Sequence, residues 1–326
     1  MSFGPHVLSL DADHAVDSIS RWIKEQAIHT LHRRGIVLGL SGGIDSAVCA
    51  ALCVKSLGRE NVLALLMPEV ASNSDSLRLG MLVVERLGVP YIVEEISAML
   101  EAAGCYQRQE EAIREVLPEY ENEWKFKLTL PSVVARSRLA ITSIVVEKSD
   151  GECIRRRMSA SAYRKLVAAT NFKQRVRKMI EYYHADRLHY AVCGTPNRLE
   201  YDQGFFVKNG DGSADLKPIA HLYKTQVFHI ARFLGIPQEI MQRVPTTDTF
   251  SLPQTQEEFY FGLPYDKMDL CIYAVNNGIP PSEVAPSLGH TVEQVQLMFS
   301  DILSKRRATR NLHLKSLVLG RILDSD

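Results

Sequence analysis

The chain has 326 residues, with 38 lysines and arginines and 38 aspartates and glutamates, so its net charge at neutral pH is zero. This balance gives no electrostatic case for binding nucleic acid or a membrane surface. No run approaches the roughly 20 apolar residues that span a bilayer, and the N-terminus lacks a secretory signal, so we expect a cytoplasmic protein. The six cysteines and ten histidines show no metal-ligand spacing, which predicts reduced thiols and no zinc site.

The first hundred residues alternate between helical and strand patterns. Apolar residues at helical spacing predict an amphipathic helix over residues 10–34. Short apolar runs and the segments between them predict the following strands and helices: strands 36–40, 61–67 and 89–93, and helices 47–57 and 75–87. This order predicts an α/β fold with a parallel, doubly wound sheet flanked by helices. Ligands of such sheets bind at the carboxyl ends of the strands.

The first strand runs into Ser41–Ser46 (SGGIDS), directly before a helix. Backbone N–H groups of such a turn lie at the positive end of the helix dipole and can hold a phosphate. Gly42 and Gly43 let the backbone approach the anion closely. Asp45 would repel a phosphate unless a Mg²⁺ lay between them. The alternative is an ordinary tight turn in which Asp45 or Ser46 only caps the helix. The turn lacks the Gly-Lys-Ser/Thr ending of a Walker A loop.

Residues 97–168 interrupt the alternation of strands and helices. Charge clusters among apolar residues at helical spacing predict mostly helices, with an exposed segment near 149–160. The segment would cover a sheet edge or form an oligomer contact. The basic run Arg155–Arg157 favours a solvated face, and phosphate binding is the alternative.

The remaining sequence returns to the α/β pattern. We expect a helix over Thr170–Ala185, a strand over His189–Cys193 and a helix over Lys224–Leu234. The region from about 265 to 326 is predicted to be helical, most clearly over Thr291–Leu303, where Thr291 is the expected N-cap.

Five further motifs follow in order: NFKQRVR at 171–177, GTPNRLE at 194–200, GFFVKNGDGSAD at 204–215, LYKTQV at 222–227 and PTTD at 245–248. The SGGIDS turn resembles the loop of the N-type ATP pyrophosphatases. Together the six motifs resemble the NAD synthetase family. The resemblance implies one synthetase-like domain over residues 1–326 with the adenine nucleotide alpha hydrolase-like fold, a helical insertion at about 100–168 and a C-terminal helical segment at about 265–326.

The resemblance also implies a reaction. The family uses ATP and Mg²⁺ to adenylate the carboxylate of deamido-NAD, releasing pyrophosphate, and ammonia then displaces AMP to give NAD. A homodimer is implied by the resemblance alone. Only about 35 residues precede the turn, so we expect no glutaminase domain in this chain. Ammonia would then be free or delivered by a separate glutaminase.

Site residues follow from the resemblance, position by position. Asp45 and Glu200 correspond to the Mg²⁺ ligands, and Asp45, Lys208 and Lys224 to the catalytic residues. The implied ATP contacts are Gly39, Leu40, Ser41, Gly42, Gly43, Ile44, Asp45, Ser46, Thr195, Lys224 and Thr246. The implied contacts to deamido-NAD are Arg175, Lys208, Asp215 and His313.

Some positions depart from the family pattern. Pro196 and Asn197 stand where short members often have Asp-His, and Leu314 separates a His-Lys pair that is adjacent in the family. These departures leave ATP use untouched but bear on the acceptor. Two alternatives follow: an amide ligase of the same fold that acts on a different carboxylate, and a non-catalytic nucleotide-binding protein. The second is disfavoured because Asp45, Glu200, Lys208 and Lys224 are all present.

Overall fold

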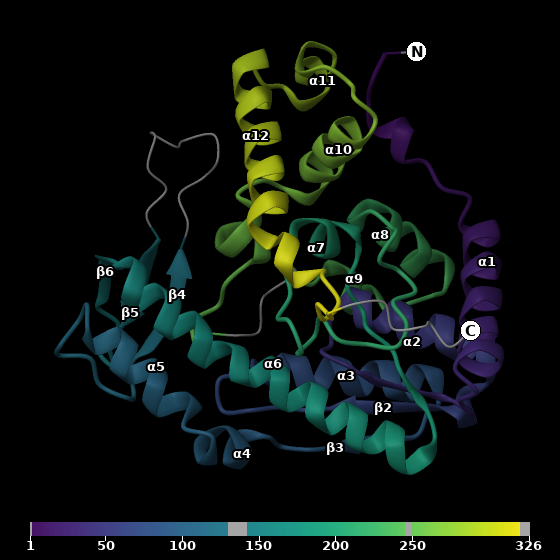
Figure 1. Ribbon diagram of the computed structural model, residues 1–326, viewed down its shortest axis with the longest axis horizontal. Coiled ribbons are helices and arrows are strands. Elements are labelled where there is room, and N and C mark those ends of the chain that lie inside the picture. The colour runs from purple at the N-terminus through teal and green to yellow at the C-terminus, as the bar shows by residue number, and fades with distance from the viewer. Residues whose placement is uncertain (1, 130–141, 245–249, 320–326) are drawn as a thin grey trace.

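The computed structural model describes residues 2–129, 142–244 and 250–319. Its centre is a parallel sheet of four strands in the order β3-β2-β1-β7 (Figure 1). The strands are β1 (Ile36–Gly39), β2 (Val62–Leu66), β3 (Tyr91–Val93) and β7 (Ala191–Val192). Ile36 of β1 pairs with Val62 on one side and with Ala191 on the other. The predicted parallel, doubly wound sheet is therefore confirmed.

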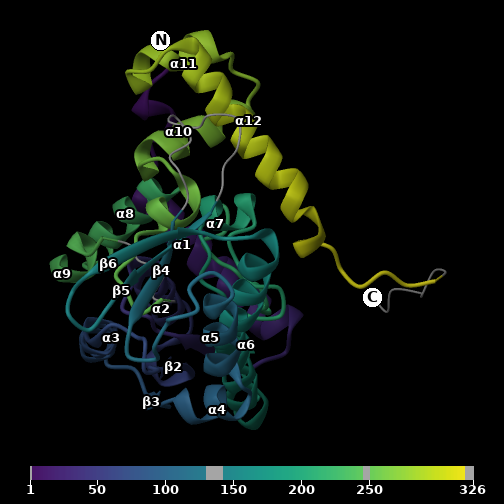
Figure 2. The ribbon, with the colours of Figure 1, turned by 90° about the vertical axis from the view of Figure 1, so that its left-hand side faces the viewer.

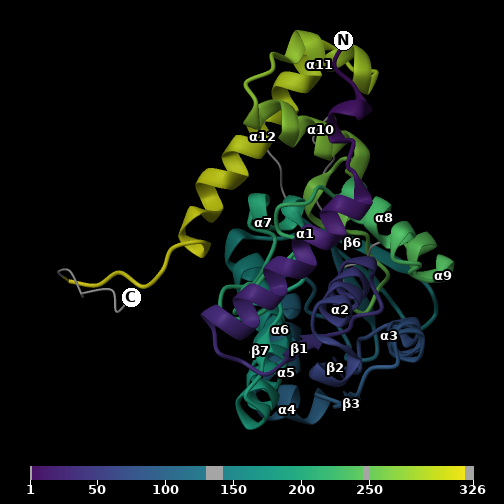
Figure 3. The same ribbon diagram turned by 90° about the vertical axis from the view of Figure 1, so that its right-hand side faces the viewer.

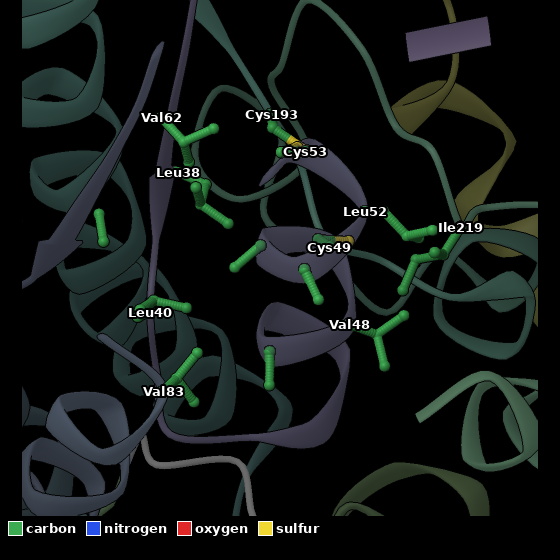
Figure 4. Close-up of a cluster of buried hydrophobic side chains, with 14 of the residues drawn as sticks. Leu38, Leu40, Val48, Cys49, Leu52, Cys53, Val62, Val83, Cys193 and Ile219 are labelled. Carbon is green, nitrogen blue, oxygen red and sulfur yellow. The ribbon is translucent and has the colours of Figure 1, made fainter. Parts of the chain in front are cut away.

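Helices cover both faces of this sheet. One face carries α1 (Ala12–Lys24), α2 (Ile44–Leu57), α3 (Ser74–Leu87), α8 (Lys224–Phe233) and α9 (Gln238–Gln242), and the other carries α4 (Ser97–Ala102) and α6 (Ala160–Leu188). Successive strand residues point to opposite faces. Leu38 therefore packs against α2, as Figure 4 shows, whereas Val37 faces α6. This burial on both faces explains why the strands are continuous apolar runs.

Helix α2 begins inside the SGGIDS turn rather than after it. Its first residue is Ile44, three residues before the predicted start, and Gly43 is its N-cap. Neither Asp45 nor Ser46 caps the helix, so the alternative in which these residues serve only as caps is wrong. The amphipathic helix at the N-terminus is confirmed as α1, continued by a π-helical turn over Glu25–Thr30.

The C-terminal part forms a second layer with its own apolar core. Its helices are α7 (Arg198–Gln203), α10 (Tyr265–Asn276), α11 (Pro281–Leu288) and α12 (Val292–Thr309). Figures 2 and 3 show α10, α11 and α12 stacked beyond one end of the sheet layer, with the N-terminal end of the chain beside α11. Thr291 caps α12 as predicted, in a capping box with Gln294. Short helical turns complete the chain at Pro5–Leu8, Arg59–Asn61, Glu257–Phe261 and Arg310–Leu312.

The prediction of mostly helices over residues 97–168 is wrong in part. After α4 and α5 (Cys105–Arg114), the chain forms an antiparallel sheet of β4 (Lys125–Thr129), β5 (Ser143–Glu147) and β6 (Cys153–Arg157). The sequence KFKLT of β4 alternates polar and apolar residues, which is the signature of a half-buried strand. The apolar side chains of β4 and β5 pack with the first turns of α6.

The basic run of this insertion lies on an edge strand. Arg155–Arg157 belong to β6 and are exposed, which agrees with a solvated face. Charged residues on an edge strand also discourage pairing with other chains. The six cysteines are free, and Cys153 is the exposed member of the set. Within the described ranges, no helix combines the length and apolar character needed to cross a membrane.

The turn between β1 and α2 requires glycine at one position in particular. Gly42 has φ +71°, and a Cβ there would lie 2.6 Å from the carbonyl oxygen of Ser76 and 2.9 Å from Cβ of Leu79. Gly43 has φ −90°, and its added Cβ would meet only the Ser41 hydroxyl at 3.2 Å. A left-handed conformation costs a residue with a side chain roughly 1–2 kcal/mol.

We therefore expect Gly42→Ala to lower the free energy of unfolding by at least about 2 kcal/mol, the strain of the backbone plus the collision with Ser76. Urea unfolding measures this change. Gly43→Ala is the matched control and should cost clearly less. Equal losses at the two positions would contradict the conformational requirement at Gly42.

Candidate active site

The turn Ser41–Ser46 connects the carboxyl end of β1 to the first turn of α2. Its two serines organise the backbone: Ser46 Oγ donates to the carbonyl of Gly43 at 3.0 Å, and Ser41 Oγ accepts from the N–H of Gly43 at 3.3 Å. The first N–H groups of a helix have no partner within it. Here no side chain caps α2, so these donors face the cavity beside the turn. The arrangement is suited to an anion.

Two cavities meet at this turn. The larger has a volume of 510 Å³ and is lined by the turn, by α6 and by residues of the 195–208 and 250–260 segments. The smaller has a volume of 170 Å³ and lies over the carboxyl ends of β1 and β2, against Gly39, Leu40 and Met67. Ser41 and Thr195 line both cavities. The two cavities therefore adjoin at these residues.

Asp45 lines the larger cavity and bonds to two neighbouring polar side chains. Its carboxylate forms an ion pair with Lys224, the first residue of α8. It also accepts a hydrogen bond from the side-chain amide of Asn197, at 3.1 Å. The Lys224 side chain is fully buried, and its ammonium group lies 5.7 Å from the ring centroid of Tyr265. Lysine is almost never fully buried without a partner. Asp45 is this partner, and the ion pair holds the buried ammonium beside the turn Ser41–Ser46.

Glu200 lies beside Asp45 on the same cavity. One carboxylate oxygen accepts from the backbone N–H of Asn197 at 3.1 Å, and the other accepts from the side-chain amide of Gln256 at 3.0 Å. Burial, and then the negative charge of Asp45, raise the pKa of Glu200 to about 7. Two carboxylates held close enough to disfavour each other's ionisation make a suitable place for a divalent cation.

A cation bound there would need further oxygen ligands. Among the described residues, no group of three or more His, Cys, Asp or Glu side chains could hold a metal. Mg²⁺ often binds through one or two carboxylates together with substrate phosphates. The pair Asp45 and Glu200 fits that mode, in which the phosphates complete the coordination.

The residues predicted to contact the acceptor are only partly brought together. Arg175 of α6 and Lys208 both line the larger cavity, and Arg175 donates to the backbone carbonyl of Lys208 at 3.4 Å. The ammonium group of Lys208 donates to the carbonyls of Asn311 at 3.0 Å and Leu314 at 3.4 Å. These hydrogen bonds hold the segment after α12 against the cavity, and Leu312 of this segment lines it.

Other predicted residues lie outside the cavity walls. Asp215 is exposed, and its carboxylate accepts from the backbone N–H of Val192 at 2.7 Å and from the hydroxyl of Tyr182 at 3.3 Å. It therefore joins β7 to α6 within this chain. His313 packs its ring edge-on against Tyr201 and Phe206, with centroids 4.9 and 5.1 Å away. Phe206 itself lines the cavity, so His313 supports its wall.

Thr246, a predicted ATP contact, lies outside the described residues, as does the whole PTTD motif at 245–248. The role assigned to it stays a prediction.

Sequence reasoning missed three side chains of the site. Asn197 bridges Asp45 and Glu200, and the spacing Asn197-x-x-Glu200 is a capping-box pattern that could have identified it. Gln256 reaches Glu200 from the 250–260 segment, and no local pattern indicates this contact. Asp211 lines both cavities and accepts from the N–H of Val207 at 2.9 Å. Burial raises the pKa of Asp211 above the usual value of an aspartate.

Comparison with known proteins finds relatives over nearly the whole chain. The chain is 55% identical over 312 residues to an NH(3)-dependent NAD(+) synthetase of Mesorhizobium japonicum, covering 96% of this chain and 98% of that protein. Two solved structures share the fold at 21% identity. The first is the NMN synthetase of Francisella tularensis, with a TM-score of 0.64, which covers 96% of this chain and 100% of that chain. The second is the NH3-dependent NAD synthetase of Campylobacter jejuni, with a TM-score of 0.62, which covers 95% of this chain and 100% of that chain.

The sequence model of the family described as NAD synthase matches residues 15–151 and 134–310. These matches include the turn at Ser41–Ser46, the insertion and both carboxylates of the cavity. The chain therefore belongs to the NAD synthase family.

Proposed function

We propose that this protein uses ATP to convert deamido-NAD to NAD with ammonia as the nitrogen source. The observation that carries the proposal is the phosphate turn with Asp45 and Glu200 on one cavity, in a chain 55% identical to an NH(3)-dependent NAD(+) synthetase. In the first step a carboxylate oxygen of deamido-NAD attacks the α-phosphorus of ATP, and pyrophosphate leaves. In the second, ammonia attacks the acyl carbon, AMP leaves and one proton is released.

The residues of the chain bind and orient the reactants rather than forming a covalent intermediate. The turn and Lys224 bind the departing pyrophosphate, whose negative charge grows as the bond to the α-phosphorus breaks. The smaller cavity accepts the adenine base, with Thr195 at the junction. Arg175 and Lys208 hold the acceptor through its anionic groups, for which guanidinium and ammonium are suited. Asp211, at the junction of the cavities, is placed to accept the proton lost from the attacking nitrogen.

We infer that Mg²⁺ binds Asp45 and Glu200 together with the phosphates of ATP. Bound Mg²⁺ would neutralise phosphate charge and favour departure of pyrophosphate. The ammonia is free or comes from a separate glutaminase, and the reaction belongs in the cytoplasm, where ATP is supplied. A ligase acting on a different carboxylate remains the alternative, motivated by the insertion and by Leu314.

The direct test is a product assay with purified protein, ATP, Mg²⁺, ammonium and deamido-NAD. We expect NAD, AMP and pyrophosphate in equal amounts, because each turnover transfers one AMP and releases it. Nicotinic acid mononucleotide, as a smaller acceptor, and a panel of simple carboxylates serve as controls. Formation of AMP with another acceptor but none with deamido-NAD would favour the alternative, and no turnover of any acceptor would favour a binding protein.

Replacing the two carboxylates tests their assignment. Asp45→Asn and Glu200→Gln should each lower kcat by at least about 100-fold, because a neutral side chain holds a divalent cation weakly. The Mg²⁺ concentration for half-maximal rate should also rise. Asp17→Asn, which removes an exposed ion pair with Lys55, is the control and should leave both quantities unchanged. Near-normal rates in both site variants would show that the metal ligands lie elsewhere.

We also propose a homodimer. Met179 and Tyr183 lie four residues apart on α6 with 57% and 60% of their surface exposed, as expected for an apolar contact face. Light scattering should give twice the chain mass, and the double variant Met179→Ser/Tyr183→Ser should shift it toward the monomer. A monomeric mass for the wild type at micromolar concentration would contradict the proposal.

A further inference from the structure

A buried carboxylate outside the cavity lies behind Lys224. Asp269, in the first turns of α10, is fully buried, and its Oδ2 accepts a hydrogen bond from the backbone N–H of Thr225 at 2.8 Å. Thr225 is the second residue of α8 and directly follows Lys224. Helices α10 and α8 pack against each other, and Figures 1 and 3 both show α10 beside the start of α8.

Asp269 supplies a side-chain hydrogen-bond acceptor for a free N–H group at the start of α8. The N-cap of α8 is Tyr223, which has no short side chain of the kind that usually caps a helix. A carboxylate from another helix can satisfy the free N–H groups and interacts favourably with the positive end of the helix dipole. Burial raises the pKa of Asp269 to about 6, whereas hydrogen bonds from the backbone of Thr225 and Lys224 act in the opposite direction.

The backbone that Asp269 holds is the one from which Lys224 projects. The Lys224 side chain runs through the interior from α8 to Asp45, with which its ammonium forms an ion pair. Lysine has four rotatable side-chain bonds, and the reach of its ammonium depends on where its Cα is held. A shift of the first turn of α8 would therefore move the charge away from the phosphates.

We propose that Asp269 is a positioning residue that holds Lys224 at the phosphate turn. It acts without touching the reactants, because it fixes the first turn of α8, the backbone from which Lys224 projects. This inference rests on the proposed function for the identity of the reaction, but not for the geometry. It assigns the C-terminal layer a part in the chemistry, because α10 belongs to the apolar core of that layer.

A double-mutant cycle separates this role from a merely structural one. Asp269→Ala should lower kcat at least about 10-fold, the effect of losing one charged hydrogen bond. Asp269→Asn should recover part of the rate, because its amide oxygen can still accept from Thr225. In the background of Lys224→Ala, Asp269→Asn should change kcat less than 2-fold, since the group that it positions is gone. The Km for deamido-NAD should stay within about 2-fold of the wild type throughout.

Thermal unfolding of each variant sets the assay temperature, so that only folded protein is compared. If Asp269→Ala does not fold, the cycle is completed with Asp269→Asn alone. Asp202→Asn is the matched control: Asp202 pairs with Arg306 of α12 and also fastens the C-terminal layer, but it has no link to Lys224. It should lower stability without lowering kcat of the folded protein.

Two results would overturn the proposal. One is the same fold-change in kcat for Asp269→Asn whether Lys224 is present or replaced by alanine. The other is an unchanged kcat in Asp269→Ala. Wild-type turnover of deamido-NAD separately tests the proposed function. If that acceptor is not used, the same cycle is measured on the dissociation constant of Mg²⁺-ATP by calorimetry, where Asp269→Asn should weaken binding only when Lys224 is present.

Discussion

The ion pair between Asp45 and Lys224 is the interaction on which the rest of the site depends. It joins α2 to α8 across 179 positions of sequence at the carboxyl edge of the parallel sheet. Without Lys224, Asp45 would face Glu200 with its charge uncompensated, and the pKa of Glu200 shows that the two carboxylates already disfavour each other. Lys224 likewise could not be buried as an ammonium without Asp45. The buried charges of the site are therefore stable only together. A bound cation would compensate the two carboxylates, and phosphates would in turn compensate the cation.

The insertion contributes to the cavity through its core rather than through its surface. Its apolar cluster includes Phe250, and it packs against Tyr163 and Phe259, which line the larger cavity. The antiparallel sheet thus lies behind an aromatic wall of the larger cavity. The exposed arginines of β6 lie on the edge of that sheet and take no part in the wall. The insertion therefore contributes to the shape of the larger cavity.

The departure from the family at Leu314 has a structural explanation. Lys208 binds the main-chain carbonyl of Leu314, and any residue at that position offers the same carbonyl. The Leu314 side chain is itself 47% exposed. A substitution there consequently leaves the contact to Lys208 in place. At Asn197, by contrast, the identity of the side chain matters. Its amide donates a hydrogen bond to Asp45, and its oxygen caps α7 by accepting from the N–H of Glu200.

Local sequence was sufficient for the sheet, most helices and the turn between β1 and α2, because strand periodicity, caps and the positive φ of Gly42 depend on residues close in the chain. The motifs also predicted Asp45, Glu200, Arg175 and Lys208 as site residues, and the structure brings these four side chains to one cavity. Local sequence failed for β4–β6, where alternation over five residues was masked by charge clusters. The links from Asp45 to Lys224, from Glu200 to Gln256 and from Asp269 to Thr225 were decided only by the tertiary structure. Each joins residues more than 40 positions apart, and which buried charges become neighbours depends on how whole helices pack.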